Sequence, residues 1–153
     1  LRIPLLHAAS TGDAVHLKKL LVLGASPNSR DSDGYFALHL AAGAGHHDSV
    51  AVLLEHGANV HATDRDGHTA LHRAATNNDP RTLAVLVEAG ADVSLRSAWN
   101  NTSPLDAAAV AGSVAAIRFL RKKGADVHAA NTHGRTALHQ AAVRDKAYAI
   151  EEL

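Results

Sequence analysis

The chain has 153 residues, with 15 Lys and Arg against 15 Asp and Glu, so its formal net charge at pH 7 is zero. This balance excludes a polybasic nucleic-acid binder, and the length favours one domain, because globular domains usually contain about 100–200 residues. The absence of Cys excludes a disulfide framework, a thiolate nucleophile and Cys-ligated zinc.

The beginning of the chain carries no targeting pattern. The first four residues do not resemble a signal peptide, and no apolar run approaches the roughly 18 residues of a membrane span. The chain starts without Met and ends inside an amphipathic pattern. We therefore expect a piece of a longer protein, monomeric and without membrane insertion.

Leucine recurs along the chain at a nearly constant interval. Intervals of 33, 33, 34 and 33 residues separate Leu5, Leu38, Leu71, Leu105 and Leu138. Each leucine is followed three residues later by an alanine pair, and the chain contains 32 alanines. A fixed period of about 20–50 residues is the signature of a repeat protein. The pattern predicts one repeat domain over residues 1–153, with units at about 1–29, 30–62, 63–95, 96–129 and 130–153.

Within each unit, the order of residues predicts a turn, a short helix that carries the alanine pair, a tight connection and a second helix. The second helix has an apolar stripe with helical spacing, as in Leu17 and Leu20 of the first unit. In four units a glycine ends this helix, and glycine suits the left-handed position that follows a helix. These glycines are Gly24, Gly57, Gly90 and Gly124.

The start of the second helix is also marked. Asp13, Asp79 and Ser113 are candidate N-caps, and Pro80 stands at the first helical position, where a missing N–H costs nothing. The alanine pairs of the first helices have side chains small enough to let neighbouring helices approach closely. We therefore expect the first helices of successive units to pack against one another.

Three stretches of nine residues carry a family resemblance. They are GYFALHLAA at 34–42, GHTALHRAA at 67–75 and GRTALHQAA at 134–142, and GHHDSVAVLLEHGANV follows the first at 45–60. They resemble ankyrin repeats, whose unit has 33 residues and the signature T-P-L-H-x-A. The resemblance implies an all-α solenoid of stacked antiparallel helix pairs, with projecting hairpin-like turns and a concave face. It covers five units, of which the first and last are incomplete.

The sequence departs from the signature at several positions. Alanine stands in place of its proline in three units, at Ala37, Ala70 and Ala137. Phe36 replaces its threonine, and Leu6 and Asp106 replace its histidine.

The turn of the fourth unit is one residue longer than the others. Asn100 or Asn101 takes the place of Gly67, since Asn tolerates a positive φ better than other non-glycine residues. Trp99, the single Trp of the chain, stands at the tip of this turn. Trp is enriched in binding hot spots. Trp99 either contacts a partner or packs across an adjacent turn, and the sequence leaves both interpretations open.

The chain contains 12 histidines, and the repeat accounts for most of them. The resemblance implies that His39, His72 and His139 form hydrogen bonds within the turn and at the start of the first helix. His61 and His128 recur at the unit end, where a structural role is also expected. Because such imidazoles must stay neutral, we expect lower stability at pH 5 than at pH 7.5.

A metal site is not expected. The side chains of His46 and His47 are adjacent in sequence and do not face one another on a helix. His68 and His72 have i, i+4 spacing, but no carboxylate is spaced as a third ligand.

Catalytic patterns are also absent. No serine lies in a G-x-S-x-G elbow, and the glycines follow the repeat period rather than a phosphate-binding loop. Asp33, Asp64, Asp66 and Asp92 recur at turns, where Asp accepts hydrogen bonds from its own backbone. A solenoid buries its core only between neighbouring units and leaves no enclosed pocket. We therefore expect no enzyme activity and no cofactor.

The resemblance implies a noncatalytic module that binds another protein or peptide through its concave face and turn tips. We expect it in a larger intracellular protein, cytoplasmic or nuclear, as a scaffold or adaptor. The alternative is a regulatory or targeting segment of a larger enzyme or channel. The family positions that contact partners correspond to Tyr35, Arg65, His68, Arg73, Asn77, Trp99, Asn100, His133, Arg135 and Arg144. These side chains favour a partner with some acidic and some apolar character.

Three further expectations concern other surfaces. A basic cluster at a helix C-terminus is expected to offset the helix dipole rather than to bind nucleic acid; it comprises Arg118, Arg121, Lys122 and Lys123. At the two ends of the solenoid we expect exposed apolar residues such as Ile3, Leu17 and Ile150. The resemblance also implies that such repeats can be substrates of an asparaginyl hydroxylase, for which Asn28 stands at the matching position.

Overall fold

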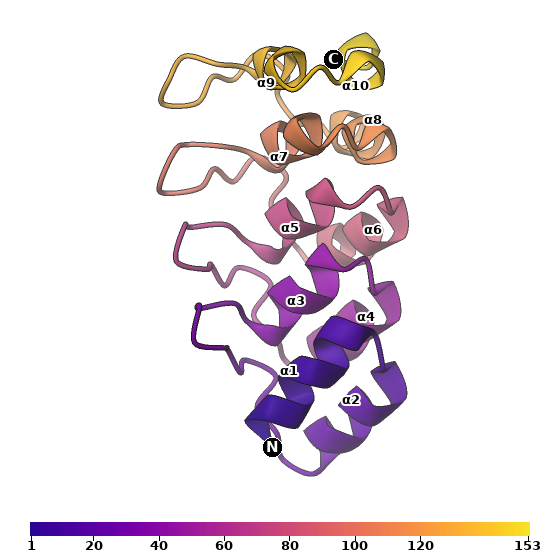
Figure 1. Cartoon of the computed structure of the whole chain (residues 1–153). Coiled ribbons are helices and arrows are strands. Elements are labelled where there is room, and N and C mark those ends of the chain that lie inside the picture. The colour runs from indigo at the N-terminus through magenta and orange to yellow at the C-terminus, as the bar shows by residue number, and fades with distance from the viewer.

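Ten helices form five antiparallel pairs that stack in one direction in a computed structural model, which describes all 153 residues (Figure 1). The first helices of the pairs are α1 (Arg2–Thr11), α3 (Ala37–Gly43), α5 (Ala70–Thr76), α7 (Pro104–Ala111) and α9 (Ala137–Val143). The second helices are α2 (Ala14–Val22), α4 (His47–Glu55), α6 (Pro80–Glu88), α8 (Val114–Lys122) and α10 (Ala147–Glu151). No strand forms, and the predicted all-α solenoid is confirmed.

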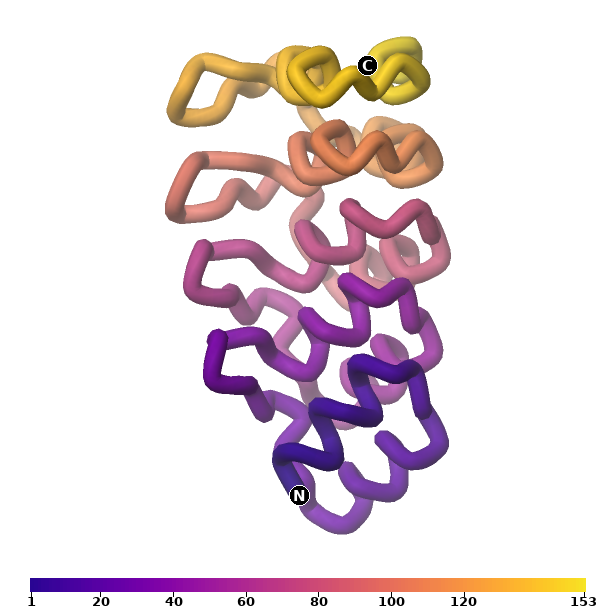
Figure 2. Tube along the Cα trace, viewed as in Figure 1, coloured from indigo at the N-terminus to yellow at the C-terminus, as the bar shows by residue number.

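The turns before the first helices all project to one side of the stack (Figure 2). Two of them contain a single antiparallel bridge, between Arg30 and Phe36 and between Thr63 and Thr69. The two ends of the chain lie at opposite ends of the stack (Figure 2). No helix in the structure has the length and apolarity that crossing a membrane requires.

The first helices contact one another in sequence order, from α1 through α3, α5 and α7 to α9. Their alanine pairs make this possible, because the alanines of the first four units are almost completely buried between helices. Leu5, Leu38, Leu71 and Leu105 lie in the same continuous core. In α9, which packs on one neighbour only, Leu138 is partly exposed. The core is therefore built between units, as the repeat predicts.

One expectation for the ends of the stack is wrong. Ile3 and Ile150 are exposed as expected, at 74% and 38%, but Leu17 is completely buried. The helix that carries Leu17, α2, packs against both α1 and α4, and these two helices cover its apolar stripe. The exposed apolar residues of α2 are Val15 and Val22 at its two ends.

The predicted helix ends are confirmed in most units. Asp13 accepts a hydrogen bond from the N–H of His16, and Asp79 accepts one from the N–H of Arg81. Pro80 is the first residue of α6. The four glycines that end the second helices have φ values of 90°, 87°, 95° and 90°.

Ser113 stands at the N-cap of α8 but does not cap it. Its hydroxyl donates to the carbonyl of Thr76 in the preceding unit, at 2.9 Å. The side chain of Asn78, also in the preceding unit, accepts the N–H of Ala115 instead. The preceding unit thus caps α8, whereas the sequence had predicted Ser113 as the N-cap.

The basic cluster of α8 lies as predicted near the helix C-terminus, with Arg121 and Lys122 in the last turn. Two of its members have a further role. Arg118 forms an ion pair with the carboxylate of Glu152, and Arg121 donates to the Glu152 carbonyl. These contacts join the fourth unit to the fifth.

Candidate functional site

The hairpin turns are held by one side chain in each of three units. Asp64 Oδ1 accepts the N–H groups of Asp66 and His68, at 3.0 and 2.9 Å. Asp31 and Asn131 accept the corresponding N–H groups in the second and fifth units. The expectation for Asp64 is therefore confirmed.

Two of the other aspartates expected to bond their own backbone do not do so. Asp33 and Asp66 lie two residues too far along the turn, and they supply an N–H to the aspartate before them instead of accepting one. Asp92 does accept the N–H of Ser94, at 2.8 Å. The first polar residue of the turn, rather than the aspartate near its tip, therefore sets the turn geometry.

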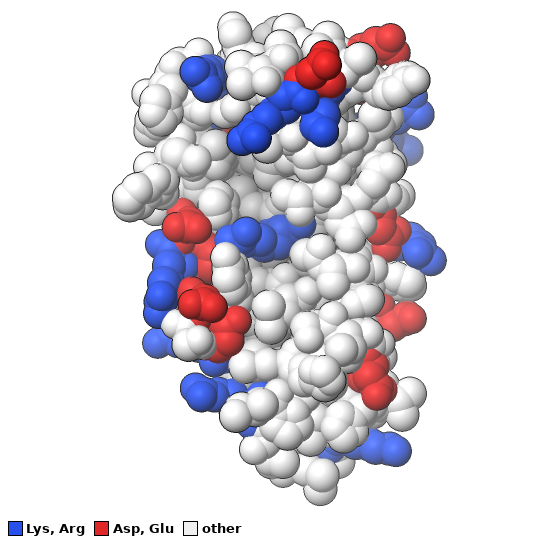
Figure 3. Space-filling model, in the orientation of Figure 1, with Lys and Arg blue, Asp and Glu red and all other residues white.

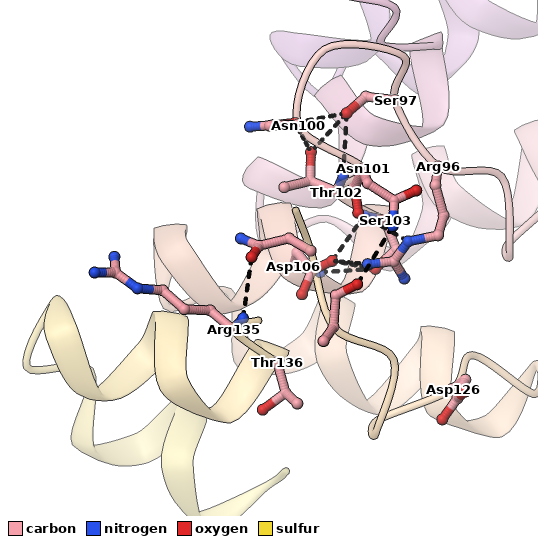
Figure 4. Close-up of polar contacts among 12 residues, drawn as sticks. Arg96, Ser97, Asn100, Asn101, Thr102, Ser103, Asp106, Asp126, Arg135 and Thr136 are labelled. Carbon is pink, nitrogen blue, oxygen red and sulfur yellow. Dashed lines mark hydrogen bonds and ion pairs between the residues drawn. The ribbon is translucent and has the colours of Figure 1, made fainter. Parts of the chain in front are cut away.

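The longer turn of the fourth unit is held by three side chains (Figure 4). Ser97 Oγ accepts the N–H of Thr102 and donates to Asn100 Oδ1, at 2.7 Å. Thr102 Oγ1 donates to the same Asn100 oxygen, at 2.8 Å. Of the two candidate asparagines, Asn101 has the positive φ, 55°. The loop is therefore fixed by its own hydrogen bonds.

Trp99 is 79% exposed at the tip of this loop, and no hydrogen bond or aromatic contact to it is found. The interpretation that it packs across an adjacent turn is therefore wrong. An indole is displayed to solvent on a loop with a fixed backbone.

Neighbouring turns are joined to each other. Arg65 donates to the Ser32 carbonyl across the second and third units. Thr132 donates its N–H to the carbonyl of Asn100, at 3.2 Å, across the fourth and fifth. The Asn101 side chain donates to the Ala130 carbonyl, at 3.3 Å. Hydrogen bonds therefore link the second turn to the third and the fourth turn to the fifth.

His72 links its own helix to the turn of the next unit. Its Nδ1 accepts the N–H and hydroxyl of Thr69, at 3.2 and 3.0 Å, and its Nε2 donates to the Thr102 carbonyl, at 3.0 Å. The contact within the unit was expected, whereas the contact to the next unit was not. Because a backbone N–H points at Nδ1, the imidazole must be neutral.

His39 and His139 each keep part of the hydrogen-bond arrangement described for His72. His39 Nε2 donates to the His68 carbonyl, at 2.9 Å, but its Nδ1 has no partner because Phe36 replaces the threonine. His139 Nδ1 accepts from Thr136 in the expected way. The structural role expected for His61 and His128 is wrong, because both are exposed and neither imidazole forms a hydrogen bond.

These histidines predict that stability falls in mild acid. Burial lowers the pKa of His72 to about 4, and burial also lowers the pKa values of His39 and His68. Between pH 6.5 and pH 4 the unfolded chain therefore binds more protons than the folded chain, so the stabilisation present above pH 6.5 is lost as the pH falls. His72 alone should cost about 2 kcal/mol at pH 5 relative to pH 7.5. Urea unfolding at the two pH values measures this loss.

Asp106 should make the protein more stable, not less, as the pH falls, because burial raises its pKa. The hydrogen bonds from Ser103 and the charge of Arg96 oppose this rise. The three histidines with lowered pKa values should affect the pH dependence of stability more than this one carboxyl does. A His72→Gln variant is the matched comparison, since it removes the imidazole whose pKa burial lowers most and should therefore reduce the pH dependence. An equal free energy of unfolding at both pH values would contradict the burial argument.

The first helices of the third to fifth units, together with the turns of the third and fourth, line an open hollow of about 340 Å³ on the concave face. Figure 3 shows it as a mostly uncharged area between two groups of basic side chains. We call it the concave hollow, and its walls are His68, His72, Arg73, Thr76, Asn100, Thr102, Asp106, Ala107, Val110, Gln140 and Arg144.

Four of the ten predicted partner-binding residues lie in the wall of this hollow: His68, Arg73, Asn100 and Arg144. Trp99, Arg65, His133 and Arg135 are exposed on the turns, whereas Tyr35 and Asn77 are partly buried. Asn77 donates to the Gly43 carbonyl of the preceding unit, at 3.4 Å. The predicted set therefore consists of four residues in the wall of the hollow, four exposed residues on the turns and two partly buried residues.

The guanidinium of Arg73 forms hydrogen bonds with other residues of the chain. Its Nε donates to Asp64 Oδ2, at 3.1 Å, and its Nη2 donates to the same oxygen and to the Tyr35 hydroxyl. The guanidinium also lies 4.7 Å from the centre of the Tyr35 ring. Burial would raise the pKa of Asp64, but the hydrogen bonds from Arg73 and from the His68 N–H hold it below its ordinary value. The arginine thus joins the second and third units.

Asp106 is the buried carboxyl of the fourth unit and stands where the signature has histidine. Its Oδ2 accepts the N–H and hydroxyl of Ser103, at 2.8 and 2.9 Å, and Arg96 lies 3.3 Å away (Figure 4). Asp106 completes a capping box at the start of α7, as His72 does at the start of α5. The sequence pattern gave no indication that Arg96 would pair with it.

Two carboxylates lie beside His68, although His72 takes no part in this cluster. Donor atoms of Asp64, Asp66 and His68 lie within 4.8 Å of one another. However, both oxygens of Asp64 already accept N–H groups, and the Arg73 cation lies on this carboxylate. A second cation is therefore disfavoured, and the cluster does not have the character of a metal site.

Two family models match the chain. Residues 5–97 match a model described as ankyrin repeats (3 copies), and residues 105–145 match one described as ankyrin repeats (many copies). Curated proteins named ankyrin repeat domain-containing protein 46, from Rattus norvegicus and Mus musculus, are each 50% identical to this chain over 46 residues. The matched segment covers 30% of this chain and 20% of each relative, so this chain spans about a fifth of the relatives' length.

Proposed function

Because the chain belongs to the ankyrin-repeat family, we propose that it is a recognition module that binds a partner protein through the concave hollow and the turn tips. Ankyrin repeats generally mediate protein–protein interaction and are typically noncatalytic. We further propose a scaffold or adaptor role within a larger intracellular protein, cytoplasmic or nuclear, which the module joins as a monomeric unit.

The observation that best supports this proposal is the exposed indole of Trp99 beside the concave hollow. Its loop is held by Ser97, Asn100 and Thr102, and Asn100 also lines the hollow. A side chain displayed on a fixed backbone loses little conformational entropy when a partner docks. Because Trp residues are enriched among hot spots, Trp99 should be an anchor of the interface.

Trp99→Ala is the direct test. We expect about 30-fold weaker retention of the partner, the size of a hot-spot truncation. The free energy of unfolding should change by less than about 0.5 kcal/mol, because the side chain is exposed and bonds to nothing. Quantitative pull-down with the whole chain, followed by titration of the retained protein, measures the first quantity, and urea unfolding measures the second.

Glu88→Ala on the outer helix α6 is the matched control, since Glu88 is exposed and lies away from the turns. It should retain the partner as well as the unmodified chain does. Equal retention by Trp99→Ala and the unmodified chain would show that the partner does not use the turn tips.

A further inference from the structure

We propose that the concave hollow accepts the carboxylate of an Asp or Glu side chain in an extended segment of the partner, and that Arg144 binds this carboxylate. The inference rests on the proposed function and specifies which chemistry the partner presents. Most charged side chains in or behind the wall already have a partner within the chain, whereas Arg144 has none.

Two charge pairs in or behind the wall are satisfied internally. Asp64, whose side chain is 1% exposed, is neutralised by Arg73. Asp106, which is also buried, accepts from Arg96. Neither carboxylate therefore offers a free negative charge to the hollow, and the guanidinium of Arg73 is not a free cation.

Among the permanently charged side chains of the wall, Arg144 is the one without an ion-pair partner. It follows α9 in the fifth unit, its side chain is exposed, and it takes part in no ion pair or side-chain hydrogen bond. The next two residues, Asp145 and Lys146, carry opposite charges that sum to zero. None of the ion pairs in the structure involves Asp145, Lys146 or Arg144. The opening of the hollow is therefore positive on the side of the fifth unit.

The uncharged polar groups in the same wall add to this preference. The Oδ1 atom of Asn100 is occupied by two hydroxyls, which leaves its amide nitrogen free to donate, and this nitrogen points away from the loop (Figure 4). Gln140 also has no side-chain partner. These groups can donate to a carboxylate or to the carbonyls of an extended chain.

Ala107 and Val110 of α7 supply the apolar part of the wall. They can cover the methylene groups of an acidic side chain while its carboxylate reaches Arg144. A free inorganic anion would gain the one charge but none of this apolar contact. An extended acidic segment therefore matches the wall better than a small anion does.

The test uses two pools of fluorescein-labelled nonapeptides with random flanks, one with a fixed central Glu and the other with a fixed central Lys. Fluorescence anisotropy with the whole chain should show about fivefold tighter binding of the Glu pool, which is the size expected for one partly exposed charge pair. Arg144→Gln should abolish the difference between pools. Arg144→Glu should reverse it in favour of the Lys pool.

Lys122→Gln is the matched control, because Lys122 is an exposed cation of the outer helix α8 that does not line the hollow. It should keep the preference for Glu. Urea unfolding of each variant verifies that the fold is unchanged.

The outcomes separate the two proposals. Equal binding of both pools by the unmodified chain, or a preference that survives Arg144→Gln, would overturn the role of Arg144. In that case the effect of Trp99→Ala on partner retention still decides the proposed function.

Discussion

Arg73→Ala is expected to lower the free energy of unfolding by about 3 kcal/mol, because it leaves the buried carboxylate of Asp64 without its cation. The side chain of Asp64 is 1% exposed, so water replaces the lost guanidinium poorly. The substitution also removes the contact between Arg73 and the Tyr35 ring of the preceding unit. Urea unfolding at pH 7.5, where Asp64 is ionised, measures the loss.

The chain itself offers a control for this prediction. In the fifth unit, Asn131 and Gln140 stand at the positions of Asp64 and Arg73, and Asn131 accepts the same two backbone N–H groups. The double variant Asp64→Asn, Arg73→Gln copies this neutral pair and should lose no more than about 1 kcal/mol. If the single and double variants were equally unstable, the unpaired charge would not be the cause.

Gly67→Ala should be nearly as damaging, with an expected loss of about 3 kcal/mol from two causes. Gly67 has a φ of 78°, which residues with a Cβ rarely adopt, and a Cβ there would lie 2.5 Å from the backbone nitrogen of Ala98. The longer turn of the fourth unit would have to move away from the third. Thermal and urea unfolding measure the loss.

Gly134→Ala separates the two causes. Gly134 has a similar φ of 70°, but nothing lies within 4 Å of the position that its Cβ would take. It should lose only about 1 kcal/mol, the cost of the backbone conformation alone. Equal losses at the two glycines would mean that the turns of the third and fourth units are not in close contact.

The repeat correctly predicted that the first helices stack on one another through their alanine pairs. The other features that were predicted correctly are those that each unit specifies by itself, such as the glycines after the second helices. Asp13 and Asp79 cap the helices that follow them directly. These interactions are local, so the spacing of residues is enough to predict them.

Some of the predictions failed because they depend on a neighbouring unit. The hydroxyl of Ser113 is taken by Thr76, and the apolar stripe of Leu17 is covered by a helix of the second unit. Arg73 lines the concave hollow, where its position in the unit places it, but the sequence did not indicate that Asp64 and Tyr35 also hold it. An alignment of the units does not reveal this pair, because the second unit keeps the aspartate as Asp31 but has Leu40 at the position of Arg73.

The concave hollow could be located from sequence only approximately. Arg144 and Asn100 were predicted at its edge, but Asp106 and Thr102 were not, because their place in the wall depends on how the longer turn folds. Trp99 was recognised as unusual, but its exposure could not be deduced, because packing on a neighbouring turn was equally compatible with the sequence.

Hydrogen exchange of the chain, with and without the protein that it retains most strongly, tests the central claim most directly. Binding through the concave face should slow exchange in the turn at residues 97–102 and in α7 and α9, while α4, α6 and α8 exchange as in the free chain. Protection confined to these outer helices, with no change in the turn or in α7, would contradict the account.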